Sequence, residues 1–151
     1  MNSEMNSEWK EIVAEWRGGM AFEGKNEVGS SVQMGTLDGK PGVSPMELLL
    51  LGLAGCTGMD VAHILRKKRQ PLQDLRVNLR ARRADQHPKV YTEIEITYLL
   101  WGEGLSRKAI EQAIQLSEGK YCSASAMLGK TAAIKSTYQI LAPGEKIMSY
   151  K

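Results

Sequence analysis

The longest hydrophobic stretch of the chain lies inside a helix that the pattern predicts over residues 44–69. Three signals mark its start. Ser44 is a favourable N-cap, Pro45 suits the first helical position, and Glu47 completes a capping box with Ser44. Four cations at residues 66–69 close it, where the helix dipole favours positive charge. The apolar residues 48–51 leave no polar side to the helix, and this predicts burial all round.

Small residues interrupt the middle of this helix, around a cysteine. Glycine costs about 1 kcal/mol relative to alanine inside a helix, so several glycines together predict close approach of another backbone. These glycines are Gly52, Gly55 and Gly58. Cys56 lies among them, is expected to be buried, and shares a helix face with Asp60 and His63. The apolar run ends at Asp60, and we expect it to be too short to cross a bilayer.

Alternation with a period of two predicts strands on both sides of the helix. Before it, strands are expected at residues 9–16, 20–23 and 28–34, the first two joined by a turn at residues 17–19. After it, residues 75–82 and 91–98 form a predicted antiparallel hairpin with opposite charges on its outer faces. The remaining elements are a helix from Ser106 to a stop at Gly119, a short helix at 121–128 and a strand at 131–141. We predict one α+β domain over residues 1–151, with residues 1–7 as a flexible tail.

Composition narrows the class of protein. Hydrophobic content of 42% and charged content of 25% are ordinary for a globular domain, and a net charge of +3 requires no polyanionic partner. The basic residues already have helix-end and cross-strand roles and no aromatic residues interleave them, so we expect no nucleic-acid partner. The shortness of the apolar run predicts no membrane partner. The N-terminus does not resemble a signal peptide, which predicts a cytoplasmic location. With only two cysteines, the chain has neither a disulfide scaffold nor a four-cysteine zinc site.

The two cysteines, Cys56 and Cys122, leave two interpretations open. Free cysteines are often small buried hydrophobes, and in that case they carry no chemistry. The other interpretation is thiol redox chemistry, in which Cys122, at the start of a short helix, would be the attacking thiol on local physics alone. A metal site of Cys56, Asp60 and His63 fits no standard ligand spacing, so we expect no metal and no cofactor.

Two motifs resemble one protein family. The segment S-P-M-E-L-L-L-L-G-L-A-G-C and the later Y-C-S-A-S-A-M-L resemble the OsmC/Ohr family of thiol-dependent peroxidases. The resemblance extends to the order of the predicted elements and covers nearly the whole chain. It implies an OsmC-like fold of antiparallel sheets around a long central helix, in an intertwined homodimer with the site at the dimer interface. Two long helices would meet there, where their side chains are small.

The resemblance also implies roles for both cysteines. Cys56 would attack the O–O bond of an organic hydroperoxide and become a sulfenic acid, and Cys122 would then form a disulfide with it. An external dithiol would reduce that disulfide, as part of oxidative stress defence. This order of attack is the reverse of the one that local physics gives.

The chain departs from the peroxidases of this family at one position. There the helix proline is followed directly by a glutamate, which pairs with an arginine that activates the thiolate. Here Met46 follows Pro45, and the carboxylate comes one residue later, at Glu47. Arg17 and Glu47 are the candidate auxiliaries, with a solvated turn arginine and a capping-box glutamate as their structural alternatives. A rival from another class is a non-catalytic protein of the same fold that binds a small ligand or senses redox state.

Overall fold

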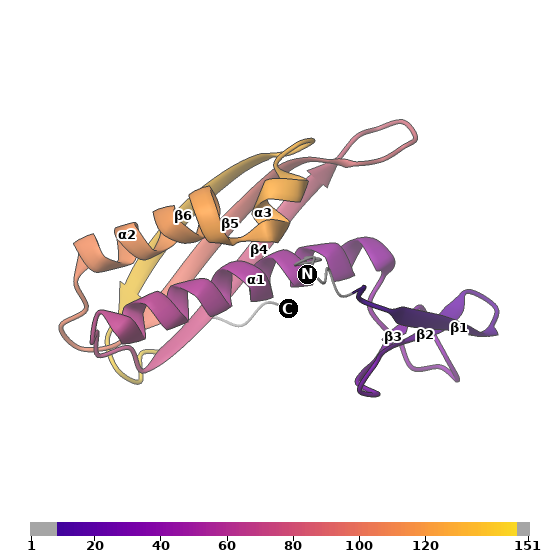
Figure 1. Ribbon diagram of the computed structural model, residues 1–151, viewed down its shortest axis with the longest axis horizontal. Coiled ribbons are helices and arrows are strands. Elements are labelled where there is room, and N and C mark those ends of the chain that lie inside the picture. Colours follow the sequence, from indigo (N-terminus) through magenta and orange to yellow (C-terminus); the bar gives the residue numbers. More distant parts are fainter. Residues whose placement is uncertain (1–8, 148–151) are drawn as a thin grey trace, which may run out of the picture. The chain divides into compact units, whose positions relative to one another are not determined.

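The structure, a computed structural model, describes residues 9–147 (Figure 1). The predicted tail at residues 1–7 lies outside the described residues. The described chain forms two compact units, one up to Leu49 and one from Leu50 onward. The first unit holds a small sheet and the start of the long helix, and the second holds the rest of that helix, a second sheet and three shorter helical segments.

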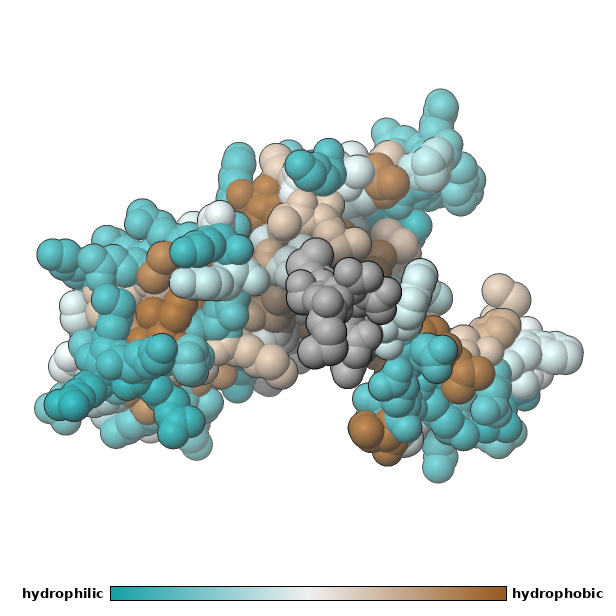
Figure 2. Space-filling model, in the orientation of Figure 1, coloured by the Kyte–Doolittle hydropathy of each residue, from teal (hydrophilic) through white to brown (hydrophobic). Residues whose placement is uncertain are grey.

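The first unit is a three-stranded antiparallel sheet of β1 (Ile12–Gly18), β2 (Ala21–Asn26) and β3 (Ser31–Met34). The predicted turn between the first two strands is present, and Gly18 and Gly19 both have positive φ there. β3 begins later than predicted because Asn26 organises a turn, in which its Oδ1 accepts from the amides of Val28 and Ser30. Hydrophobic residues, drawn in brown, reach the surface of this unit in Figure 2. Its exposed large side chains also include Trp16.

The long helix α1 (Pro45–Lys67) begins where its start signals placed it. The Ser44 amide donates to Glu47 at 3.1 Å and the Glu47 amide donates to the Ser44 hydroxyl at 3.0 Å, so both halves of the capping box form. The helix ends two residues earlier than predicted, since Arg69 has a φ of +55°. Its buried face carries Leu53, Thr57, Val61 and Leu65.

By length and composition α1 could cross a membrane, which corrects the expectation that its apolar run is too short. Its contacts identify it instead as a core helix. The buried Thr57 side chain bonds to Tyr98 of the second sheet, and a methyl group of Val77 lies beside Gly58. One face of the helix therefore packs against folded protein.

The second sheet consists of β4 (Asp74–Arg83), β5 (Tyr91–Trp101) and β6 (Ala133–Leu141), in that order. β4 and β5 form the predicted antiparallel hairpin, but β6 runs parallel to β5, so the prediction of antiparallel sheets is wrong for this pair. The reason lies in the connection. Residues 102–132 contain helices, and such a crossover lets the chain return in the same direction.

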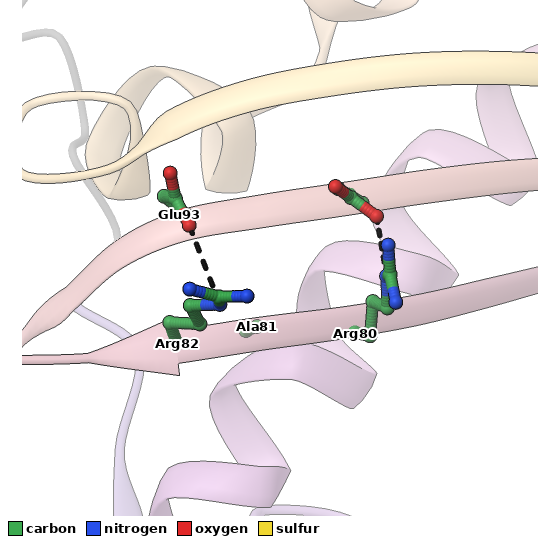
Figure 3. A pocket seen from close by; sticks show the side chains of 5 residues that line it. Arg80, Ala81, Arg82 and Glu93 are labelled. Atoms are coloured by element: carbon green, nitrogen blue, oxygen red, sulfur yellow. Dashed lines mark hydrogen bonds and ion pairs between the residues drawn. The ribbon is translucent and has the colours of Figure 1, made fainter.

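Opposite charges face each other across the hairpin, as predicted. Arg80 lies opposite Glu95 and Arg82 opposite Glu93, and both pairs form ion pairs on the outer face (Figure 3). The other face of β5 is buried by Ile94, Ile96 and Tyr98. The charged face of the hairpin is thus exposed, and its apolar face is the one that packs toward α1.

Three helical segments follow β5: α2 (Arg107–Leu116), the π-helical turn η1 (Ser117–Tyr121) and α3 (Ser123–Leu128). Ser106 caps α2, and the predicted apolar stripe is its buried face. Gly119 does not stop the helix, because the chain passes through it in the wider turn of η1. Contacts from Tyr98 to Thr57 and to Glu118 place α1 and η1 on the same face of the sheet.

Candidate functional site

The two cysteines lie together in the second unit. The sulfurs of Cys56 and Cys122 and a carboxylate oxygen of Asp60 all lie within 4.8 Å of one another. Both cysteines are free thiols. Cys56 is half-buried, less enclosed than the fully buried thiol that the sequence predicted, whereas Cys122 is only 2% exposed.

The π-helical turn brings Cys122 to this position. A π turn closes its hydrogen bonds over five residues, and here the Cys122 amide donates to the Ser117 carbonyl at 2.7 Å. Cys122 then caps α3, and its sulfur accepts from the Ser125 amide at 3.3 Å. The chain therefore changes direction at Cys122, with the thiol held by the first turn of the next helix.

Ser117, at the start of that turn, anchors the segment to α1. Its side chain is fully buried and donates to Asp60 at 2.8 Å. Its hydroxyl also lies 2.9 Å from that of Thr57, the residue after Cys56. The turn that carries Cys122 is thus fixed to the helix segment that carries Cys56.

The chain of hydroxyl groups continues into the sheet. Thr57 lies 2.6 Å from the hydroxyl of Tyr98, which donates to Glu118 at 2.7 Å. Ser136 of β6 donates to the same Glu118 oxygen. Burial raises the pKa of Tyr98 far above its usual range, so this phenol stays protonated and serves as a donor.

Sequence reasoning missed this chain of hydroxyl and carboxylate groups. Of its members, only Asp60 was noted, as a residue on the helix face of Cys56. A signal was available in part, because Thr57 and Tyr98 are polar residues at positions that the periodicity assigns to the core. Such residues need hydrogen-bond partners, but the sequence does not name them.

Burial decides the protonation of Cys122. Desolvation raises its pKa, and the neighbouring Cys56 side chain raises it further, while the side chain and amide of Ser125 lower it only in part. At Cys122 burial thus outweighs the helix start, which weakens the local argument for this residue as the attacking thiol.

The structure places both candidate auxiliaries in local interactions. Arg17, in β1, forms ion pairs with Glu23 at 2.9 Å and with Glu15 at 3.1 Å. Glu47 takes part in the capping box, and the hydrogen bond from the Ser44 amide lowers its pKa. Both residues thus have partners that explain them without reference to the cysteines.

His63, which was predicted to share the face of Cys56, is not part of the cysteine cluster. It is exposed in a surface hollow with Met59 and Ala62. Cys122, rather than His63, lies beside Cys56 and Asp60. Two thiols and a carboxylate at this spacing can form a disulfide after a small movement of the sulfurs, or can act together as ligands.

Comparison with known proteins identifies relatives that match most of the chain. A model of the family described as OsmC-like protein matches residues 37–137. The chain is 35% identical over 127 residues to protein YhfA of Escherichia coli strain K12, a match that covers 84% of this chain and 95% of that protein.

Solved structures show the same architecture. A hypothetical protein from Aquifex aeolicus VF5 is 39% identical, with a TM-score of 0.81 over 89% of this chain and 98% of that one. An OsmC-like protein from Mycoplasma pneumoniae is 16% identical, with a TM-score of 0.76 over 89% and 99% of the two chains. The organic hydroperoxide resistance protein OhrB of Bacillus subtilis is also 16% identical, with a TM-score of 0.59 over 87% and 98%. The last two comparisons concern the fold alone.

Proposed function

This chain belongs to the OsmC-like protein family, and from that premise we propose that it reduces organic hydroperoxides through Cys56 and Cys122. The observation that carries the proposal is the pairing of two free thiols, within 4.8 Å of each other, in different environments. The substrate class is the one named for the structurally similar OhrB protein.

The first step takes place at the more accessible sulfur. Cys56 is half-buried and Cys122 is buried, so a hydroperoxide reaches Cys56 first. The Cys56 thiolate attacks the outer oxygen of the peroxide, the O–O bond breaks, and the alkoxide leaves with a proton as an alcohol. Sulfur is oxidised to a sulfenic acid and the peroxide is reduced.

The second step uses the protected thiol. The Cys122 sulfur attacks the sulfur of the sulfenic acid, and hydroxide leaves with the Cys122 proton as water. Because the Cys122 pKa is raised, this thiol stays protonated and does not compete for peroxide in the first step. An external dithiol then returns the Cys56–Cys122 disulfide to two thiols, which closes the cycle.

We further propose that the chain works as a homodimer in the reducing cytoplasm. The support is that α1 exposes large apolar side chains, with Leu49 at 49%, Leu51 at 54% and Met59 at 76% exposure. An apolar helix face of this kind is typical of a surface that a partner covers. The two free thiols are compatible with a reducing compartment.

The test is to treat the reduced protein with one equivalent of an alkyl hydroperoxide and to map the products by mass spectrometry. Wild type should give an intrachain Cys56–Cys122 disulfide. Cys122→Ser should react as fast and accumulate sulfenic acid at Cys56, since serine cannot resolve it. Cys56→Ser should react far more slowly. A fast-reacting Cys56→Ser protein would reverse the two roles.

A second candidate function is redox sensing without turnover. It is favoured by Asp60, whose carboxylate lies within 4.8 Å of both sulfurs, because a negative charge there disfavours a thiolate. A sensor would be oxidised once, stoichiometrically, and would not consume hydroperoxide when excess dithiol is supplied. Steady-state consumption of an alkyl hydroperoxide with dithiothreitol separates the two functions.

A further inference from the structure

We infer that Cys56, Cys122 and Asp60 form a binding site for a thiophilic divalent cation, of which Zn²⁺ is the type. One ligand atom from each residue lies within 4.8 Å of the other two. In a tetrahedral zinc site with sulfur at about 2.3 Å and oxygen at about 2.0–2.2 Å, neighbouring ligand atoms are separated by about 3.5–3.8 Å. The three atoms are thus near the required spacing, and the fourth position is left for water.

The backbone supports this set of ligands. Cys56 and Asp60 are four residues apart on α1, so their side chains project from the same helix face one turn apart. Cys122 comes from the N-cap of α3, held in place by the π-helical turn. Two rigid elements therefore present the three ligands.

The Asp60 carboxylate is oriented by a hydrogen bond, but no cation among the described residues pairs with it. One Asp60 oxygen, Oδ2, accepts from the buried Ser117 hydroxyl, and this bond orients the carboxylate. Such outer bonds to a ligating group are typical of metal sites. Among residues 9–147, no cation forms an ion pair with Asp60, so a half-buried negative charge stands beside two thiols without a positive partner.

The residue that follows Cys122 by three positions offers donors to a metal-bound sulfur. Its sulfur already accepts from the Ser125 amide. The Ser125 hydroxyl is buried and has no hydrogen-bond partner in the described part of the chain. This orphaned hydroxyl is a donor that a metal-bound sulfur would satisfy.

Binding would replace two thiol protons by one metal ion, so that Zn²⁺ enters and two protons leave for each site filled. No electrons move in this step. Both sulfurs are then engaged by the metal, and neither can attack a peroxide or form the disulfide. This consequence, protection of the site by zinc, rests on the proposed function, whereas the metal site itself does not.

The test uses the full-length reduced chain under anaerobic conditions, with Co²⁺ as a spectroscopic probe and Zn²⁺ as competitor. We expect one Co²⁺ per chain with thiolate-to-cobalt charge-transfer absorption, which Zn²⁺ displaces. Cys56→Ser and Cys122→Ser should each lose about half of this absorption. Asp60→Asn should keep both thiols and bind Zn²⁺ at least about 10-fold more weakly, as loss of a ligand requires.

Two further variants serve as a control and as an independent test of the Asp60 ligand. His63→Ala changes a histidine of the same helix outside the cluster and should bind Zn²⁺ as wild type does. Ser117→Ala removes the hydroxyl that orients Asp60 and should weaken binding by about 10-fold, which provides a test should Asp60→Asn fail to fold.

Absence of charge-transfer absorption at stoichiometric Co²⁺, or affinity for Zn²⁺ that neither Asp60→Asn nor Ser117→Ala lowers, would overturn the site. Because no hydroperoxide is present in this experiment, its outcome is independent of peroxidase turnover. Slower disulfide formation in the zinc-loaded chain, restored by a chelator, would then support the protective role.

Discussion

The Cys122 thiol carries a stability cost at high pH, because burial keeps it protonated in the folded chain. Its pKa is raised above its ordinary value, so an unfolded chain loses this proton at a lower pH than the folded chain does. The stability that the neutral thiol contributes is complete below the unfolded pKa and is lost as pH rises toward the folded pKa. The relevant window therefore begins near pH 8.5.

We predict that wild type loses more stability than Cys122→Ala between pH 7 and about 9.5. The measurement is urea unfolding at a series of pH values with a reductant present, compared between the two proteins. Parallel curves over this interval would show that burial does not control the titration of Cys122.

Arg17 is held by two carboxylates on its own sheet, and this makes it a poor candidate for activating a thiolate. We predict that Arg17→Ala alkylates at Cys56 with iodoacetamide at a rate within about twofold of wild type, with little change in stability, since exposed ion pairs contribute about 0.2–1 kcal/mol. Glu47→Gln, which alters only the capping box, is the matched control. A large decrease in rate for Arg17→Ala alone would assign it the activating role.

Between elements, Thr57 joins the long helix to both the π-helical turn and the sheet. Valine has nearly the same shape as threonine but no hydroxyl. In Thr57→Val, Tyr98 still donates to Glu118 and Ser117 still donates to Asp60, so the cost is confined to the two contacts of Thr57. We expect a loss of about 1–3 kcal/mol and slower Cys56–Cys122 disulfide formation, because the turn that carries Cys122 is less firmly held.

Urea unfolding and a timed reaction with hydroperoxide measure these two effects. Thr137→Val, on the exposed face of β6, is the control and should change stability by less than about 0.5 kcal/mol. Equal effects of the two substitutions would mean that the buried hydroxyl chain does not tie the elements together.

The elements differ in how far their sequence determines them. Helix α1 was predictable because Ser44, Glu47 and the closing cations are local signals, and the β4–β5 hairpin because its alternation and charges are local too. The parallel pairing of β6 was not, since strand direction depends on a crossover that no single segment encodes. The π-helical turn at Ser117 likewise depends on long-range bonds to Thr57 and Asp60.

The candidate site shows the same division. Family resemblance paired Cys56 with Cys122, and helical spacing placed Asp60 near Cys56, and the structure brings these three together. Spacing alone also favoured His63, which faces a surface hollow, and it could not supply the burial that raises the pKa of Cys122. Burial results from all of the elements that surround a residue, so it becomes visible only when they are assembled.

For the molecule as a whole, the glycines of α1 bear on the proposed dimer. A side chain at Gly58 would come within 3.2 Å of Val77, so the sheet explains this glycine. At Gly52 and Gly55, an added Cβ would meet no atom within 4 Å in the described chain. Within one chain, those two glycines only weaken the helix, by about 1 kcal/mol each relative to alanine. A second copy that packs closely against α1 would explain why they are small.

Replacing Gly55 with leucine distinguishes these possibilities by the sign of its effect. If a second helix packs there, Gly55→Leu overfills the contact, costs about 1–3 kcal/mol and shifts the protein from dimer to monomer in light scattering. If no second helix packs against α1, the same change raises stability by several tenths of a kcal/mol, because leucine has a higher helix propensity than glycine. We predict destabilisation and loss of the dimer. Gly119→Leu, at another glycine with open space around its Cα, is the control and should leave the dimer intact. A stable wild-type monomer at micromolar concentration, or a Gly55→Leu protein more stable than wild type, would rule out α1 as the dimer contact.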